Sequence, residues 1–159
     1  MSTREYENRK NSLRFSGKEI QLAATMLDTL QTTIDIVYYL MEQEDEQTFV
    51  LMLVSANEID LGTLLENEKR DTDILFEIDK DDALYVMLCQ DTKVDGGYHF
   101  GQRIIRNIQE GKGSDIYCTE LEIRSRNYSP KQVILKLLET FIKSKQTKQS
   151  NEIVFRSLN

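Results

Sequence analysis

The feature that most constrains this 159-residue sequence is an unbroken apolar run within residues 48–56. Every side chain from Phe49 to Val54 is apolar, so the run has no polar face to turn toward water. A short run of this kind is typical of a strand buried in the middle of a sheet. The sequence therefore predicts a sheet that is covered by other elements on both faces.

Three segments predict helices of useful length. Residues 18–43 carry apolar side chains at three- and four-residue steps, which predicts a long helix with a broad apolar stripe. We expect it to pack on its own domain, and pairing with another copy is the alternative. Residues 96–110 predict a helix with Asp95 as its N-cap and Tyr98 on its inner face. Ser129 and Pro130 mark the start of a third helix, and residues 61–69 fit a short one.

The remaining apolar runs predict strands. Residues 73–79 and 82–89 are separated by a charged turn, which is a β-hairpin pattern. Residues 115–124 alternate apolar and polar residues with a slip in phase near Thr119 and Glu120, which predicts a strand with one wetter face and room for a bulge. Residues 153–155 fit a last edge strand. The order of elements predicts an α+β fold, with a mixed antiparallel sheet flanked by helices.

Composition excludes several classes of function. The formal net charge is −7, which disfavours binding to nucleic acid, whose backbone attracts basic proteins. No run is apolar enough to span a bilayer, so we expect a cytoplasmic protein without direct membrane insertion. Cys89 and Cys118 have no neighbouring Cys or His and are expected to be buried free thiols. His99 is interpreted as structural or exposed, and neither a metal site nor a cofactor is expected.

A more specific pattern begins at Arg70. Residues 70–83 resemble the middle of a GGDEF domain, in which an Arg-x-x-Asp inhibitory-site motif stands five residues before the Gly-Gly-Asp/Glu-Glu-Phe signature. Arg70 and Asp73 match the motif, and the resemblance extends over residues 48–155. The signature position is occupied by a degenerate sequence, namely Asp79, Lys80, Asp81, Asp82 and Ala83.

The resemblance implies a palm-like (ferredoxin-like) sheet, and together with the polar start of the sequence and the apolar stripe that follows, it divides the chain into three parts. Residues 1–17 would form a flexible N-terminal segment, residues 18–43 an N-terminal helix, and residues 44–159 a degenerate GGDEF domain. In the closing stretch, Lys145 and Asn151 are in register with the family pattern. Residues 1–43 have no counterpart in that pattern.

The same resemblance implies that cyclase chemistry is lost and that the chain is not an enzyme. The signature glycines of the family let GTP phosphates approach the backbone, and Asp79 and Lys80 place side chains in that space. Ser55 and Asn57 stand where family enzymes carry a pair of Mg²⁺-binding aspartates. The following helix, which normally binds guanine, is cut short. An ordinary polar hairpin turn is the preferred interpretation of residues 79–82, ahead of any metal site.

The retained motif implies a ligand, cyclic di-GMP. An arginine fork can bind the O6/N7 edge of guanine, and a carboxylate can accept from its N1–H and amino group. The third contact of the family corresponds to Arg103, and Arg106 lies one turn further on; both can neutralise phosphates. The alternative for Arg70 and Asp73 is a surface ion pair without function.

The sequence therefore predicts a cyclic di-GMP receptor that regulates exopolysaccharide or another surface process. Its partners would be a protein of a secretion or regulatory complex, or a second copy of the chain. The first alternative is a ligand-independent protein-interaction module that uses the helix at residues 18–43. The second alternative is a weak diguanylate cyclase or a GTP-binding regulator.

Overall fold

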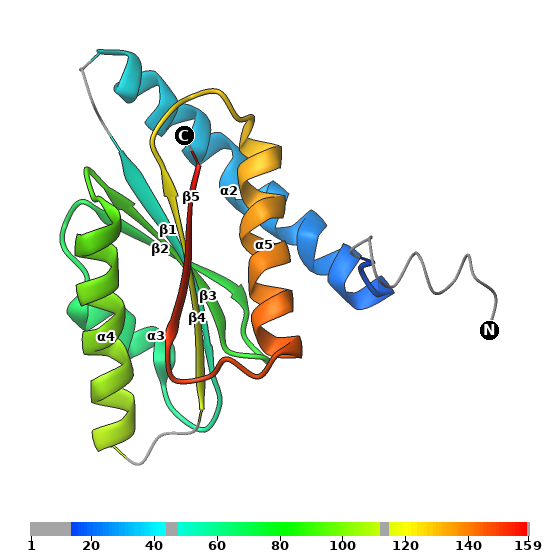
Figure 1. Ribbon diagram of the computed structural model, residues 1–159, viewed down its shortest axis with the longest axis vertical. Helices are drawn as coiled ribbons and strands as arrows, with labels where there is room; N and C mark the ends of the chain where they lie inside the picture. Colours follow the sequence, from blue (N-terminus) through cyan, green and yellow to red (C-terminus); the bar gives the residue numbers. More distant parts are fainter. Residues whose placement is uncertain (1–13, 44–47, 112–114, 159) are drawn as a thin grey trace.

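The computed structural model describes residues 14–43, 48–111 and 115–158. They form one five-stranded sheet in the order β2-β3-β1-β4-β5, in which only β4 and β5 run parallel. The predicted α+β class, with a mixed sheet flanked by helices, is confirmed (Figure 1). The elements in chain order are α2 (Gly17–Gln43), β1 (Phe49–Ala56), α3 (Leu61–Glu68), β2 (Asp73–Asp79), β3 (Leu84–Gln90), α4 (Val94–Glu110), β4 (Ile116–Ile123), α5 (Pro130–Gln146) and β5 (Ile153–Leu158).

The apolar run forms the central strand β1, and all eight residues of that strand are buried. Leu51 and Leu53 belong to the core that α2 and α5 cover, whereas Val50 and Met52 belong to the core that α3 and α4 cover. Fully burying one such side chain stabilises the fold by about 1.5–3 kcal/mol, so the strand contributes to the stability of two cores. The prediction of a buried central strand is confirmed.

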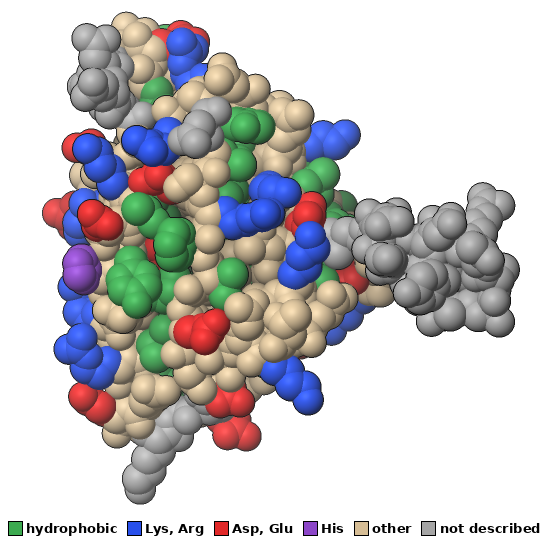
Figure 2. Space-filling model, viewed as in Figure 1, with side chains coloured by type: hydrophobic (Ala, Val, Ile, Leu, Met, Phe, Trp, Pro, Cys, Tyr) green, Lys and Arg blue, Asp and Glu red, His purple; other side chains and the backbone are tan. Residues whose placement is uncertain are grey.

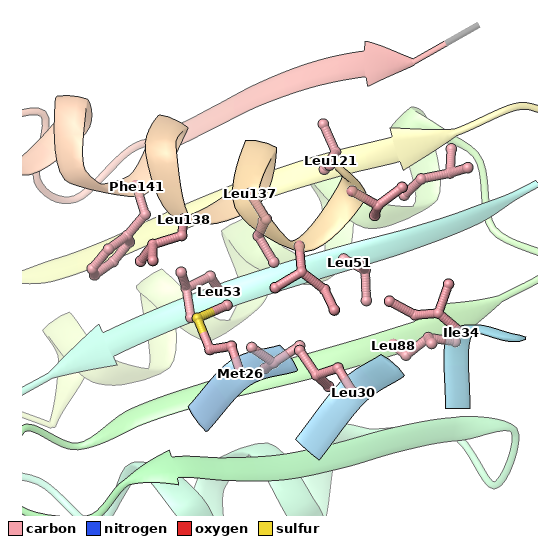
Figure 3. Packing of buried hydrophobic residues seen from close by; sticks show 14 of the residues in the cluster. Met26, Leu30, Ile34, Leu51, Leu53, Leu88, Leu121, Leu137, Leu138 and Phe141 are labelled. Atoms are coloured by element: carbon pink, nitrogen blue, oxygen red, sulfur yellow. The ribbon is translucent and has the colours of Figure 1, made fainter. Parts of the chain in front are cut away.

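Helix α2 packs on the sheet through its apolar stripe, as expected. Met26, Leu30 and Ile34 lie against Leu51 and Leu53 in the same core (Figure 3). The first thirteen residues of the predicted flexible segment lie outside the described residues, and the division into a helix and a separate domain stays a prediction. Four large apolar side chains of α2 are exposed, namely Ile20, Ile36, Tyr39 and Leu40.

Helix α5 begins as the sequence predicts. The Ser129 hydroxyl accepts from the backbone N–H of Gln132 at 3.1 Å, and the Gln132 side chain accepts in return from the N–H of Ser129 at 2.8 Å. This reciprocal capping box satisfies two N–H groups that have no partner inside the helix. Pro130 fits the first turn because its missing N–H would be unused there.

The predicted start of helix α4 is wrong. The helix begins at Val94 after Lys93, and Asp95 lies inside its first turn instead of capping it. The cap comes from the neighbouring strand, since the Glu122 carboxylate accepts from the N–H of Val94 at 2.6 Å. A carboxylate at this position also complements the positive end of the helix dipole. Tyr98, expected on the inner face, is exposed.

The predicted wetter face and bulge of strand β4 are also wrong. Thr119, Glu120 and Glu122 are all buried, and β4 pairs with β1 without a break from Phe49 to Ala56. Both faces of β4 are covered, by α4 on one side and α5 on the other. The irregularity in the sheet falls instead between Glu77 and Asp79 of β2.

Candidate functional site

The Arg70 and Asp73 side chains bind each other at the start of β2. The Arg70 backbone N–H donates to Asp73 Oδ2 at 2.8 Å, and Arg70 Nη2 donates to Asp73 Oδ1 at 2.9 Å. The Asp73 side chain is 1% exposed, whereas the Arg70 side chain is 53% exposed. The Asp73 N–H donates back to the Arg70 carbonyl, so the loop closes as a tight turn with the carboxylate inside.

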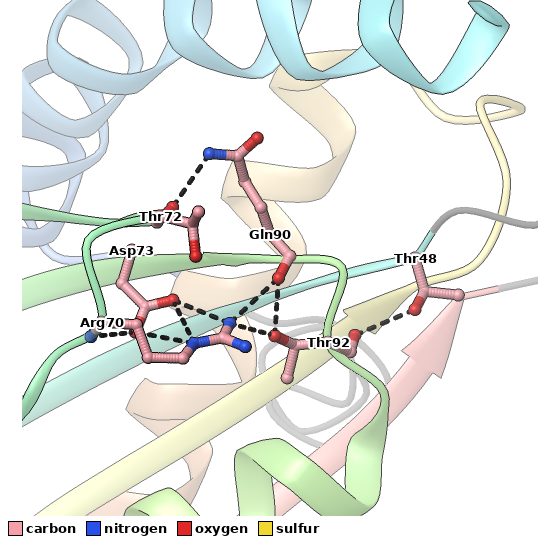
Figure 4. Close-up of polar contacts among 6 residues, drawn as sticks. All are labelled: Thr48, Arg70, Thr72, Asp73, Gln90 and Thr92. Atoms are coloured by element: carbon pink, nitrogen blue, oxygen red, sulfur yellow. Dashed lines mark hydrogen bonds and ion pairs between the residues drawn. The ribbon is translucent and has the colours of Figure 1, made fainter. Parts of the chain in front are cut away.

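The Arg70 guanidinium also ties this turn to the end of β3. Its Nη2 donates to the Gln90 carbonyl at 3.0 Å and lies 2.6 Å from the Thr92 hydroxyl (Figure 4). The hydrogen bond from Arg70 to Asp73 is the main reason that the pKa of Arg70 is raised. Within the described part of the chain, Arg70 Nη1 donates to no group, so one edge of the guanidinium is open to a ligand.

A hollow of about 240 Å³ lies beside this pair. Its walls are the Arg70 turn, the end of β3 and the first half of α4. On the α4 side, Arg103 pairs with Glu68 at 3.0 Å and lies over the Phe100 ring at 5.0 Å from its centroid. The hollow is lined by Arg70, Asp73, Cys89, Thr92, Gly96, Gly97, His99, Phe100 and Arg103.

The structure brings three of the four predicted ligand-binding residues together. Arg70, Asp73 and Arg103 share the hollow, whereas Arg106 lies on another side of α4, beside Ile105 and Phe155 in a different hollow. Thr92 and Phe100 line the site but were missed, because only the packing of α4 on the sheet brings them to the Arg70 turn. His99 is exposed at its wall, in line with the interpretation made from the sequence.

The cysteines fit their predicted role. Cys89 and Cys118 are both buried free thiols. Burial raises the pKa of each thiol well above its usual range, so both stay protonated and unreactive near neutral pH. Cys89 touches the hollow but acts there as a small apolar side chain.

Residues 79–83, interpreted from the sequence as a degenerate signature, form a polar turn at the other end of the β2–β3 hairpin, roughly 20 Å along the strand from Asp73. Asp79 Oδ1 accepts from the backbone N–H of Asp81 at 3.0 Å, and Ala83 adopts a φ of 47°. Lys80 lies at the tip of this turn. Asp82 pairs with Lys18 at 3.0 Å, and this hydrogen bond lowers the pKa of Asp82.

A second hollow, of about 360 Å³, lies beside this turn. Ser55 stands near the end of β1 and donates from its hydroxyl to the Asp82 carbonyl at 3.1 Å. Lys18 and Lys145 line the same space. Among the described residues, no three His, Cys, Asp or Glu side chains are placed to hold a metal ion. None of the described helices combines the length and apolar character needed to cross a membrane.

The topology defines a palm-like α+β domain, and comparison with solved structures specifies it further. The GGDEF domain of DgcB from Caulobacter crescentus in complex with c-di-GMP matches with a TM-score of 0.65 at 8% identity, over 80% of this chain and 86% of that chain. The active GGEEF domain of a diguanylate cyclase from Vibrio cholerae matches at 0.64 and 10% identity, over 83% and 97%. The diguanylate cyclase SiaD from Pseudomonas aeruginosa, in complex with its activator SiaC, matches at 0.64 and 10% identity, over 81% and 57%.

These matches show that the chain has the GGDEF fold. At such low identity they establish the fold alone. No protein-family model and no curated protein sequence matches the chain.

Proposed function

We propose that this chain is a cytoplasmic receptor for cyclic di-GMP that lacks cyclase activity. The observation that carries the proposal is the shared hollow, which Arg70 and Asp73 line from the turn before β2 and Arg103 lines from α4. Two of the structures that share the fold are GGDEF domains in complex with c-di-GMP. Ligand binding would recruit a protein of a secretion or regulatory complex, or a second copy, and so regulate exopolysaccharide or another surface process.

The hollow fits one guanine base better than a whole dinucleotide. Its volume of about 240 Å³ is below the range of about 300–1,000 Å³ that is usual for sites enclosing a drug-sized ligand. One base would therefore enter between Arg70 and Arg103, while the phosphodiester ring and the second base stay outside. A ligand held in this way leaves its other half available to a partner.

Guanine recognition requires Arg70 to exchange partners. Both oxygens of the Asp73 carboxylate are now occupied by donors from Arg70. Guanine N1–H and its amino group can replace part of these donors, and the released guanidinium can turn to the O6/N7 edge of the base. Because the exchange keeps the number of charge-assisted hydrogen bonds nearly constant, the buried carboxylate is never left without a partner.

The proposal of inactivity is supported by the hairpin turn. The Asp79 side chain folds into the turn and accepts its N–H groups, so those groups are not available to a triphosphate. Ser55 supplies a neutral hydroxyl that is already bonded to the Asp82 carbonyl, and a hydroxyl is a weaker ligand for Mg²⁺ than a carboxylate.

Two alternatives have observations of their own. The hollow beside Lys18 and Lys145 can accept an anion, which favours a weak cyclase or a GTP-binding regulator. The exposed apolar face of α2, with Ile36 and Tyr39, favours a ligand-independent interaction module.

Titration calorimetry with cyclic di-GMP, GTP and cyclic di-AMP separates the three functions. We expect cyclic di-GMP to bind in the micromolar range or tighter, about −8 kcal/mol, without turnover of GTP. Arg103→Ala should weaken binding by about tenfold or more, since a hydrogen bond to a charged phosphate contributes about 1.5–3 kcal/mol. Arg106→Ala is the matched control, because it removes the same charge from the same helix outside the hollow.

Each alternative predicts a different result. Equal losses in Arg103→Ala and Arg106→Ala would indicate general charge attraction instead of a site. Tighter binding of GTP than of cyclic di-GMP, or any turnover, would favour the second hollow. If the folded protein binds no nucleotide, the ligand-independent interaction module is the function that remains.

A further inference from the structure

Strand β5 is an edge strand of the sheet. It pairs with β4 on one side, and the structure places no described strand on the other. Figure 1 looks onto this strand, which lies in front of the other strands and between α4 and α5. Phe155 in its middle is 52% exposed. An exposed strand edge with an apolar centre invites pairing with another strand.

The backbone groups that face the open side can be assigned. In a parallel ladder, alternate residues direct both N–H and C=O to the same neighbour. The Leu158 carbonyl accepts from the N–H of Arg124, which follows β4, so Leu158, Arg156 and Val154 face β4. Ile153 and Phe155 therefore direct their N–H and C=O groups away from the sheet.

The side chains of β5 form a pattern that is complementary to itself. Ile153 and Phe155 lie on the α4 side and, with Tyr98 and Ile105, line a shallow hollow. Figure 2 shows hydrophobic side chains gathered on this face between α4 and β5. Read from residue 152 to residue 156, the strand runs acidic, apolar, apolar, apolar, basic. A second copy that runs in the opposite direction therefore places its basic residue beside the acidic residue of the first, and its apolar residues beside the apolar ones.

We propose that β5 pairs in antiparallel fashion with β5 of a second copy, across a two-fold axis at Val154. Ile153 of each copy then lies opposite Phe155 of the other, in hydrogen-bonded pairs built from the outward N–H and C=O groups. Glu152 of each copy lies opposite Arg156 of the other, so one such pair forms at each end of the paired segment. The two sheets become one ten-stranded sheet, and the interface is isologous, as closed dimers require.

Charge selects this register over the other symmetric ones. An axis at Phe155 would place Arg156 opposite Val154 and Glu152 opposite Leu158, so neither charged side chain would have a charged partner. An axis at Arg156 would place two arginines face to face, which is destabilising. With the axis at Val154, both charges find a partner. Within the described part of the chain, Arg156 forms no ion pair, and Glu152 accepts only a long bond of 3.3 Å from Gln149.

Sedimentation equilibrium of the full chain without nucleotide tests the association. We expect the wild type to approach twice the monomer mass as concentration rises. Glu152→Arg and Arg156→Glu should each weaken the dimer about thirtyfold, because two attractive pairs become repulsive. The double variant with both substitutions should regain most of the affinity, since the same pairs form with reversed polarity.

Disulfide trapping tests the register. In the proposed dimer, only position 154 lies opposite the same position of the second copy. This pair shares no hydrogen bonds, and its Cα atoms are about 4.5 Å apart, a separation that suits a disulfide. Val154→Cys should therefore cross-link on mild oxidation, whereas Phe155→Cys and Arg156→Cys should not. The native thiols are buried, so they do not interfere. A chain that remains monomeric at all concentrations, or a dimer indifferent to the charge exchanges, would overturn the proposal.

Discussion

Glu120 provides a sharp test of the packing between β4 and α4. Its carboxyl is buried beneath the helix, and neither oxygen has a hydrogen-bond partner among the described residues. A Cβ added at Gly97 would meet Oε1 at 2.5 Å, and one added at Gly101 would meet Oε2 at 2.6 Å. The two glycines thus let the helix lie directly on the carboxyl. Burial raises the pKa of Glu120 to about 8.

The surroundings favour the neutral carboxyl. Across the sheet, Glu120 is flanked by Met52 of β1 and Phe155 of β5, and α4 presents glycine to it. Glu122 and Cys118 are its same-face neighbours on β4, and neither is a cation. With no positive charge facing it, desolvation alone determines the direction of the pKa shift.

The consequence for stability follows from proton linkage. The unfolded chain loses the Glu120 proton near pH 4.5, whereas the folded chain keeps it until about pH 8. Between these values the folded state binds the extra proton, so the free energy of unfolding falls as pH rises. The full loss is about 5 kcal/mol, complete above pH 8, because each pH unit of difference corresponds to about 1.36 kcal/mol.

Urea unfolding from about pH 5 to about pH 9 measures this loss. We expect Glu120→Gln to flatten the decline, because the amide does not titrate. The variant carries a constant cost of about 1–3 kcal/mol for its unpaired amide, so the slope with pH, and not the absolute stability, is diagnostic. Glu66→Gln controls for the loss of one exposed carboxylate. Identical slopes in wild type and Glu120→Gln would refute the assignment of a buried neutral acid.

Four further outcomes can be checked. Leu53→Ala should lower the free energy of unfolding, measured in urea, by about 3–5 kcal/mol, because this side chain of β1 is fully buried against the helices. Ser129→Ala should cost about 1 kcal/mol in the same assay through loss of the α5 cap. Arg70→Ala should lower the melting temperature, since it leaves the buried Asp73 carboxylate with about 1–3 kcal/mol of uncompensated desolvation. Asp81→Ala should leave the calorimetric affinity for cyclic di-GMP unchanged, because the hairpin turn lies at the far end of β2.

The elements that could be predicted from sequence are those whose signals are local. The apolar run from Phe49 to Val54 and the Ser129-Pro130 start of α5 each specify their structure within a few residues. The Arg70–Asp73 pair belongs to this group in part, because a separation of three positions in a turn brings the two side chains within reach of each other.

The features that sequence did not reveal depend on contacts across the sheet. The cap of α4 is supplied by Glu122, 28 residues away, so the nearby Asp95 was a reasonable but wrong candidate. The polar residues of β4 predicted a wet face, but burial depends on which helix covers a strand, and no local pattern reports that. Phe100 and Thr92 reach the candidate site through the same tertiary packing.

Helix α4 joins these features, because one element forms part of both candidate surfaces. Its first half supplies Phe100 and Arg103 to the hollow beside Arg70, and its opposite side supplies Tyr98 and Ile105 to the surface beside β5. Two acids of β4 contact this helix: Glu122 caps its first turn, and Glu120 lies as a neutral carboxyl under its glycines. The buried apolar side chains of α4 pack in the core beside β1, so apolar contacts also anchor this helix to the sheet. The two proposed surfaces therefore share one helix, and coupling between them would require a ligand that binds two positions of α4 with different affinity.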